Sequence, residues 1–260
     1  MARAPEVRVY ETPADVAAEA ADFFLWIGDQ AIRRNNRFLV ALSGGSTPKA
    51  LYDSLCSPTH RLRLDWSRAV FCFGDERCVP PSHPDSNYGL ARDHLFTPLN
   101  ISPANIHRME GESEPLTAAQ TYEERLRHIT QAAEDALWPQ FDLILLGLGE
   151  DGHTASLFPG TAAVQEKVRW VVPGSAPNGI RQRLTLTTGV INHAGVVLFM
   201  VTGSRKAPVV QTVIEGGTSA AASYPSALVQ PDGGRLLWFL DRSAAADLTA
   251  SKREYSSDEA

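Results

Sequence analysis

The sequence predicts an α/β fold with a Rossmann-like, mostly parallel sheet and helices on both faces. Two observations predict it. Short, nearly uninterrupted apolar segments recur along the chain, as in strands buried on both faces, and each precedes a segment with helical features. The chain has 260 residues, of which 43% are hydrophobic and 21% are charged. No repeat or low-complexity linker divides it, so we expect a single domain over residues 1–250 and a polar tail over residues 251–260.

The first two elements have the clearest predicted boundaries. Val7–Tyr10 is expected to form a strand. Thr12 is the expected N-cap and Pro13 the first residue of a helix that continues to about Arg34, with acidic residues in its first turn. Apolar residues recur along it at helical spacing, so one face of this helix should pack on the sheet.

Five further units of strand, loop and helix should follow. The first is the apolar run Phe38–Leu42 and a helix expected from Pro48. The other strands are expected within residues 69–73, 141–149, 195–203 and 235–240, and the helices that follow them within residues 74–96, 150–158, 204–216 and 241–248.

Charge and cysteine content exclude several classes of function. The net charge is −6, which does not favour a nucleic-acid partner or an anionic membrane surface. Cys56, Cys72 and Cys78 are odd in number and follow no C-x-x-C spacing, as expected in a reducing compartment. The N-terminus has no apolar signal-peptide core, and no apolar run reaches the length of about 18 residues needed to span a membrane. We therefore expect a cytoplasmic protein.

Candidate functional residues follow four of the predicted strands. In open α/β sheets, ligands bind beyond the carboxyl ends of the strands, where loops and helix N-termini gather. This rule selects the segments Ser43–Thr47, Gly74–Arg77, Gly147–His153 and Thr202–Lys206.

The first segment, Ser43-Gly44-Gly45-Ser46-Thr47, suggests an anion site. Backbone N–H groups and hydroxyls would lie at the positive end of a helix dipole, and the glycines would allow close approach of a phosphate. Neither G-x-x-x-x-G-K-[ST] nor G-x-G-x-x-G is present, so the usual marks of nucleotide binding are missing. A strand-to-helix turn capped by Thr47, without a ligand, is an equally good interpretation of this segment alone.

The second and fourth segments supply charge. Asp75 and Arg77 come directly after a predicted strand, where Arg77 could hold a phosphate or carboxylate and Asp75 could accept sugar hydroxyls. A surface ion pair without a role is the alternative. Lys206 lies in the first turn of a predicted helix, which the dipole disfavours for a cation unless an anion binds beside it. Arg181 and Arg183 precede or begin another strand.

The third segment provides a candidate general base. His153 follows a buried strand, with Gly149 and Gly152 close before it in the sequence. Thr154 and Ser156 are expected to cap a following helix. Because an unperturbed histidine titrates near pH 6.5, it can take a proton from water near neutrality. A structural histidine is the ordinary alternative. We expect no metal site, since no H-x-x-x-H or H-E-x-x-H is present, and no covalent intermediate, since G-x-S-x-G is absent.

Three of these segments together resemble the 6-phosphogluconolactonase family. They read ALSGGSTPKALY, FGDERCVPPSHPDSNYGLARDHLF and LGLGEDGHTASLFPG, with supporting similarity in RLTLT, VTGSRKA and YPSALVQPDGGRLLWFLD. The similarity runs from about Val7 to about Ala246. It implies a Rossmann-like fold related to that of glucosamine-6-phosphate deaminase.

The resemblance implies hydrolysis of 6-phospho-D-glucono-1,5-lactone to 6-phosphogluconate, the second step of the oxidative pentose phosphate pathway, without a cofactor. His153 would be the general base that activates water, and Asp75 would contact hydroxyls. The residues expected to bind the phosphate or sugar are Ser43, Gly44, Gly45, Arg77, Gly152, Arg183 and Lys206. Arg183 stands directly before the strand residues LTLT, but Arg181 remains possible.

Two other functions remain open. The similar glucosamine-6-phosphate deaminases share the fold, but that family uses an acidic residue five positions after the histidine to assist ring opening. This chain has Phe158 at that position. A sugar-phosphate sensor without catalytic activity is the other, since a fold does not fix a function. Nothing in the sequence indicates the oligomeric state.

Overall fold

The computed structural model describes residues 4–130, 136–249 and 254–255. A sheet of seven parallel strands, in the order β10-β1-β9-β8-β5-β2-β3, forms its centre. These strands are β1 (Glu6–Tyr10), β2 (Phe38–Leu42), β3 (Ala69–Phe73), β5 (Leu143–Leu146), β8 (Val196–Val201), β9 (Arg235–Asp241) and β10 (Glu254–Tyr255). The predicted parallel α/β fold is confirmed.

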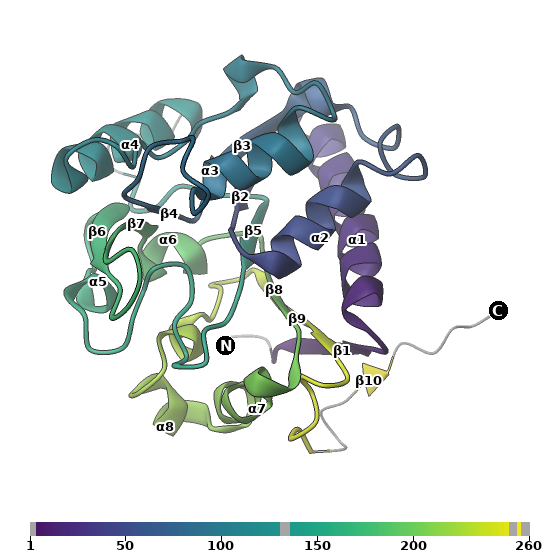
Figure 1. Ribbon diagram of the computed structural model, residues 1–260, viewed down its shortest axis with the longest axis vertical. Coiled ribbons are helices and arrows are strands. Elements are labelled where there is room, and N and C mark those ends of the chain that lie inside the picture. Colours follow the sequence, from purple (N-terminus) through teal and green to yellow (C-terminus); the bar gives the residue numbers. More distant parts are fainter. Residues whose placement is uncertain (1–3, 131–135, 250–253, 256–260) are drawn as a thin grey trace.

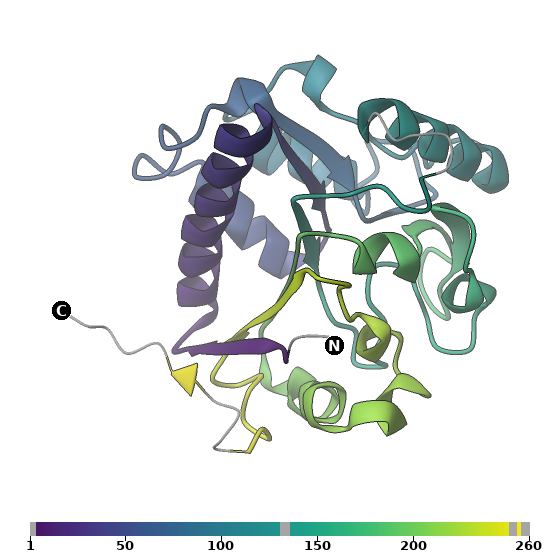
Figure 2. The ribbon, with the colours of Figure 1, turned by 180° about the vertical axis from the view of Figure 1, so that it is seen from behind.

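Helices surround this sheet (Figures 1 and 2). In Figure 1, α1 and α2 lie to its right, α4 and α6 to its left, and α7 and α8 at the bottom. The helices are α1 (Pro13–Asn35), α2 (Ser46–Leu55), α3 (Asn87–Ala91), α4 (Pro115–Thr130), α5 (Ala162–Gln165), α6 (Thr188–Asn192), α7 (Ala207–Glu215) and α8 (Gly217–Ala221). None of the helices in the described ranges is long and apolar enough to cross a membrane.

The boundary predicted for the first helix is confirmed. The backbone N–H of Asp15 donates to Thr12 Oγ1 at 3.2 Å, and the N–H of Thr12 donates to Asp15 Oδ2 at 2.9 Å. This reciprocal capping box, with Pro13 at the first helical position, satisfies N–H groups that the first turn leaves unpaired.

The core explains why the strands read as continuous apolar runs. Every residue of β2, β5 and β8 is buried. Across β8 and β9, the rings of Phe199 and Trp238 stack with their centroids 4.0 Å apart. A strand covered on both faces needs apolar side chains at every position, which removes the alternation seen in half-exposed strands.

A second sheet is present that we did not predict. It is antiparallel, has the order β4-β7-β6, and consists of β4 (Asp75–Arg77), β7 (Gln182–Leu186) and β6 (Val171–Ser175). Because β4 directly follows β3, this small sheet stands at the carboxyl edge of the large one, and its register places Arg77 opposite Arg183.

Three local predictions are wrong. Residues 150–158 form turns, because Gly152 and Ala155 adopt φ angles of 78° and 47°, which no right-handed helix accommodates. Residues 242–247 also form turns. Thr47 does not cap α2, whose N-cap is Gly45; the Thr47 hydroxyl instead shares a hydrogen bond with that of Thr202 at 3.1 Å.

The predicted polar tail, residues 251–260, lies outside the described residues except for Glu254–Tyr255. These two residues form β10, which pairs with β1.

Candidate active site

A cleft lies at the carboxyl edge of the large sheet, where the loops after β2, β3, β5 and β8 meet. It consists of two adjoining cavities of about 470 Å³ and 210 Å³. Both are lined by Asp75, Arg77, Gly149, His153, Ala155 and Lys206. Segments more than a hundred residues apart in the sequence therefore contribute to one site.

Seven of the nine predicted site residues line this cleft. They are Ser43, Gly44, Asp75, Arg77, His153, Arg183 and Lys206. Gly45 and Gly152 lie next to lining residues in the chain but do not line either cavity, and neither does Arg181, which is exposed.

His153 is paired with a carboxylate. Its Nδ1 lies 2.5 Å from Asp151 Oδ1, and about a third of its side chain (32%) is exposed. Burial acts to raise the pKa of Asp151, but attraction to His153 and the hydrogen bond from it lower that pKa below its usual value. Fixing Nδ1 as the protonated nitrogen leaves Nε2 able to accept a proton.

Glycines allow the loop to fold tightly around this histidine. A Cβ on Gly149 would lie 2.0 Å from His153 Nδ1, and a Cβ on Gly152 would lie 1.9 Å from Tyr224 Cδ1. Gly152 also has a φ of 78°, in the left-handed region that favours glycine. The predicted glycine positions thus serve the geometry of the loop.

Two arginines face each other across the small sheet. Arg77 and Arg183 are directly paired residues of β4 and β7, and the Nε of each is buried without a hydrogen-bond partner in the described structure. Burial and repulsion from Arg77 lower the pKa of Arg183, against the attraction of Asp75 and Glu76. Like charges directly opposite each other destabilise a sheet, and an anion bound between them would relieve this.

Lys206 adds a third cation. It ends a 3₁₀ turn, Ser204–Lys206, and is the N-cap residue of α7. Burial lowers the pKa of Lys206, although attraction to Glu150 acts in the other direction. A partly buried cation at the positive end of a helix is again a position that an anion would stabilise.

Asp75 is held in place by two residues that we did not predict. The residue is 7% exposed, and its carboxylate accepts hydrogen bonds from Ser156 Oγ at 2.7 Å and Asn87 Nδ2 at 3.1 Å. Asn87 is the first residue of α3, after the long loop that follows β4, and Ser156 lies in the turn after His153. Only the folded path of these two loops brings them to Asp75.

The Ser-Gly-Gly bend forms the wall of the smaller cavity. Ser43 is buried, and its Oγ has no partner among the described residues. A Cβ on Gly44 would lie 1.8 Å from Asn87 Oδ1. The glycine is therefore required for packing against Asn87, whether or not a ligand approaches the backbone there.

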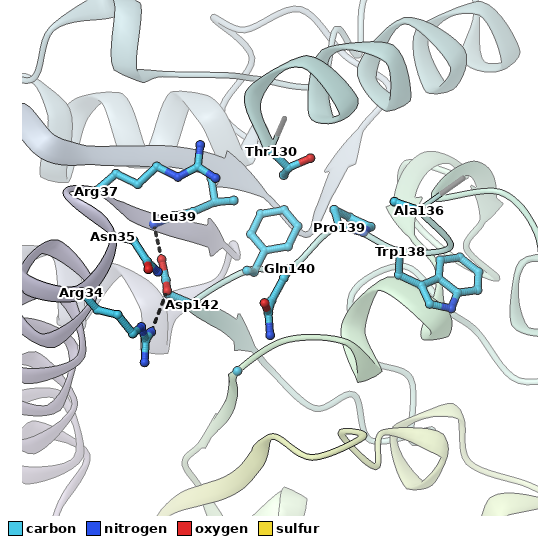
Figure 3. A pocket seen from close by; sticks show the side chains of 12 residues that line it. Arg34, Asn35, Arg37, Leu39, Thr130, Ala136, Trp138, Pro139, Gln140 and Asp142 are labelled. Carbon is cyan, nitrogen blue, oxygen red and sulfur yellow. Dashed lines mark hydrogen bonds and ion pairs between the residues drawn. The ribbon is translucent and has the colours of Figure 1, made fainter. Parts of the chain in front are cut away.

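Another pocket, of about 590 Å³, lies at the opposite edge of the sheet (Figure 3). Its charged side chains have hydrogen-bond partners. Asp142 accepts hydrogen bonds from the Leu39 N–H at 2.8 Å and from Arg34 at 3.3 Å, and Arg37 donates to the carbonyl of Ile129 at 2.6 Å. The cleft beside His153, by contrast, contains the Nε atoms of Arg77 and Arg183 and the hydroxyl of Ser43, all buried without partners in the described structure. It is therefore the better candidate for the functional site. Within the described ranges, no three His, Cys, Asp or Glu side chains are grouped in a way that could hold a metal ion.

Comparison with known proteins gives consistent matches over nearly the whole chain. Residues 11–238 match the model of a family described as glucosamine-6-phosphate isomerases/6-phosphogluconolactonase. The chain is 38% identical to the 6-phosphogluconolactonase of Nostoc sp. over 244 residues, covering 94% of this chain and 98% of that protein. It is 37% identical to the 6-phosphogluconolactonase of Rattus norvegicus over 253 residues, covering 96% of each. Among solved structures, 6-phosphogluconolactonase from Trypanosoma cruzi aligns with a TM-score of 0.85 and 32% identity, covering 96% of this chain and 99% of that one.

Proposed function

Since the chain belongs to the family of glucosamine-6-phosphate isomerases and 6-phosphogluconolactonases, we propose that it hydrolyses 6-phospho-D-glucono-1,5-lactone to 6-phospho-D-gluconate. This reaction is the second step of the oxidative pentose phosphate pathway. One observation carries the proposal: the His153–Asp151 pair lines the same cleft as Arg77, Arg183 and Lys206. A base and a cluster of cations are the two components that hydrolysis of an anionic sugar ester requires.

His153 acts as the general base. Asp151 accepts a hydrogen bond from the protonated Nδ1, which leaves Nε2 free to act as the base. Nε2 takes a proton from a water molecule as the water oxygen bonds to the lactone carbonyl carbon. The bond from that carbon to the ring oxygen then breaks, and the imidazolium returns its proton to the ring oxygen. The products are a carboxylic acid and a hydroxyl on the same open chain, and the acid ionises in water. A base placed in this way contributes a factor of about 10²–10⁴ to the rate.

The cations bind the phosphate, and the neutral polar groups bind the sugar. Arg77, Arg183 and Lys206 offset the charge of the phosphate, which also relieves their mutual repulsion. Asp75 accepts hydrogen bonds from sugar hydroxyls. Ser43 and the backbone of Gly44 complete the wall of the smaller cavity, and Gly45 and Gly152 act through the backbone shapes that they allow.

A side-by-side assay tests this function. The protein is incubated with freshly generated 6-phosphogluconolactone and, separately, with glucosamine 6-phosphate. We expect lactone hydrolysis well above the spontaneous rate and no release of ammonia. Ammonia release would indicate a deaminase, and tight binding of 6-phosphogluconate without turnover would indicate a sensor; either result would refute the proposal.

We also propose a cytoplasmic location. Cys56, Cys72 and Cys78 are all free thiols in the structure, which is typical of proteins in a reducing compartment.

A further inference from the structure

The imidazole of His153 is held by more than its partner carboxylate. Asp151 contacts Nδ1, and the backbone of Gly149 lies against the Nδ1–Cε1 edge, where a Cβ would come within 2.3 Å of Cε1. The ring of Phe158 packs against the imidazole, with centroids 4.4 Å apart and planes inclined by 36°. Among the described residues, no side chain or backbone group makes a hydrogen bond to Nε2.

Phe158 is itself firmly placed. It is 6% exposed and forms part of the wall of the larger cavity. Its carbonyl accepts hydrogen bonds from the N–H of Thr161 at 3.2 Å and from the hydroxyl of Thr161 at 2.8 Å. A tight turn just before it is closed by the hydrogen bond from the Leu157 N–H to the carbonyl of Thr154 at 2.9 Å. The phenyl ring is therefore a fixed surface.

We propose that Phe158 is a positioning residue that fixes the plane of the His153 imidazole, so that Nε2 points into the cleft. The torsion that rotates a histidine ring has a broad energy minimum, and a single hydrogen bond at Nδ1 leaves much of that rotation possible. Packing against a flat aromatic surface removes it. In this role Phe158 takes no part in making or breaking bonds and acts only through the orientation of the base.

The kinetic test of this role rests on the proposed lactonase function. Phe158→Leu keeps an apolar side chain but removes the flat surface, and Phe158→Tyr keeps the ring. Because a displacement of about 1 Å can cost about 10²-fold in rate, we expect Phe158→Leu to lower kcat by about 10- to 100-fold and to change KM by less than about twofold. Phe158→Tyr should retain most of the wild-type kcat.

A matched control separates positioning from general loss of packing. Phe141 is also buried but lines the pocket at the opposite edge of the sheet. Phe141→Leu should lower the melting temperature and leave kcat of the folded enzyme unchanged. If Phe158→Leu kept the wild-type kcat, raised KM as much as it lowered kcat, or behaved like Phe141→Leu, the positioning role would be refuted.

A second measurement does not depend on turnover. In the wild-type protein, the ring current of Phe158 should shift the Cε1–H resonance of His153 in the proton NMR spectrum, and Phe158→Leu should abolish this shift and broaden the signal. If the wild-type protein did not hydrolyse the lactone, the proposed function would fail by itself. Unchanged His153 signals in Phe158→Leu would instead refute the positioning role.

Discussion

Replacing Arg183 with methionine should stabilise the empty protein and weaken its binding of phosphate. Arg183 is paired directly with Arg77, its Nε is buried without a partner in the described structure, and burial lowers its pKa. Arg183→Met removes the charge but keeps a long apolar side chain. It should thus remove an unfavourable interaction in the free protein and a favourable one in the complex.

The magnitudes follow from the two interactions. A cross-strand pair of like charges destabilises by about 0.2–1 kcal/mol. Removing it corresponds to a rise of about 0.4–4 °C in the melting temperature of a protein of this size. A hydrogen bond to a charged group contributes about 1.5–3 kcal/mol, so KM for the phosphorylated lactone should rise by about 10- to 150-fold. The value of kcat should change little, because Arg183 holds the phosphate and not the reacting carbonyl.

Arg181→Met is the matched control, because Arg181 lies two positions earlier, is exposed and does not line the cleft. The assay combines steady-state kinetics with thermal melting at increasing concentrations of 6-phosphogluconate, since a ligand that binds the native state raises its melting temperature. A variant at position 183 that melted below wild type and kept its response to the ligand would refute this account of the arginine pair. An equal rise in KM for Arg181→Met would refute the assignment of the site to Arg183.

The remaining predictions concern the loop that carries the base. His153→Gln should lower kcat by about 10²–10⁴-fold with KM nearly unchanged, while His193→Gln, at the end of α6 and outside the cleft, should be neutral; equal kcat losses would contradict the base assignment. Gly152→Ala should unfold at a clearly lower temperature than Gly233→Ala, since both have φ near 78° but only the first lacks room for a Cβ; equal melting temperatures would contradict this. Because pairing lowers the pKa of Asp151, its contribution to stability is present above about pH 4 and is lost as the pH falls through the lowered pKa. The difference in the free energy of unfolding between wild type and Asp151→Asn should therefore shrink at acidic pH, and a constant difference would refute the pairing.

The position of the site could be predicted from the direction of the strands. The segments after β2, β3, β5 and β8 are polar and begin where continuous apolar runs end. In a parallel sheet all of these ends lie at one edge, so Ser43, His153 and Lys206 could be assigned to one region without coordinates. Strongly periodic elements such as α1 could be predicted as well, because capping and amphipathicity are local properties of the sequence.

The small antiparallel sheet could not be predicted in the same way. β4 consists of Asp75, Glu76 and Arg77, with no apolar alternation, and it is a strand only because β7 pairs with it. That register also favours Arg183 over Arg181 as the binding residue, since Arg183 is opposite Arg77 and Arg181 precedes the strand.

Contacts between side chains from separate segments of the chain could not be predicted from the sequence either. Asn87, at the start of α3, and Ser156, in a turn, reach Asp75 only because of the paths that the whole fold imposes on the chain. The turn that replaces the expected helix after His153 depends on a positive φ at Ala155, a conformation that alanine rarely adopts and that the sequence does not indicate.

Several departures from ideal folding rules lie in the lining of the cleft beside His153. Arg77 and Arg183 are like charges placed opposite each other, the Ser43 hydroxyl is buried without a partner among the described residues, and Ala155 has a φ of 47°. Each of these costs stability in the free protein, and each belongs to the lining of the cleft. The pocket at the opposite edge is larger than either cavity of the cleft, yet Asp142 there has Leu39 and Arg34 as hydrogen-bond partners. Because local rules are broken where a ligand can compensate for the cost, these features support placing the functional site in the cleft beside His153.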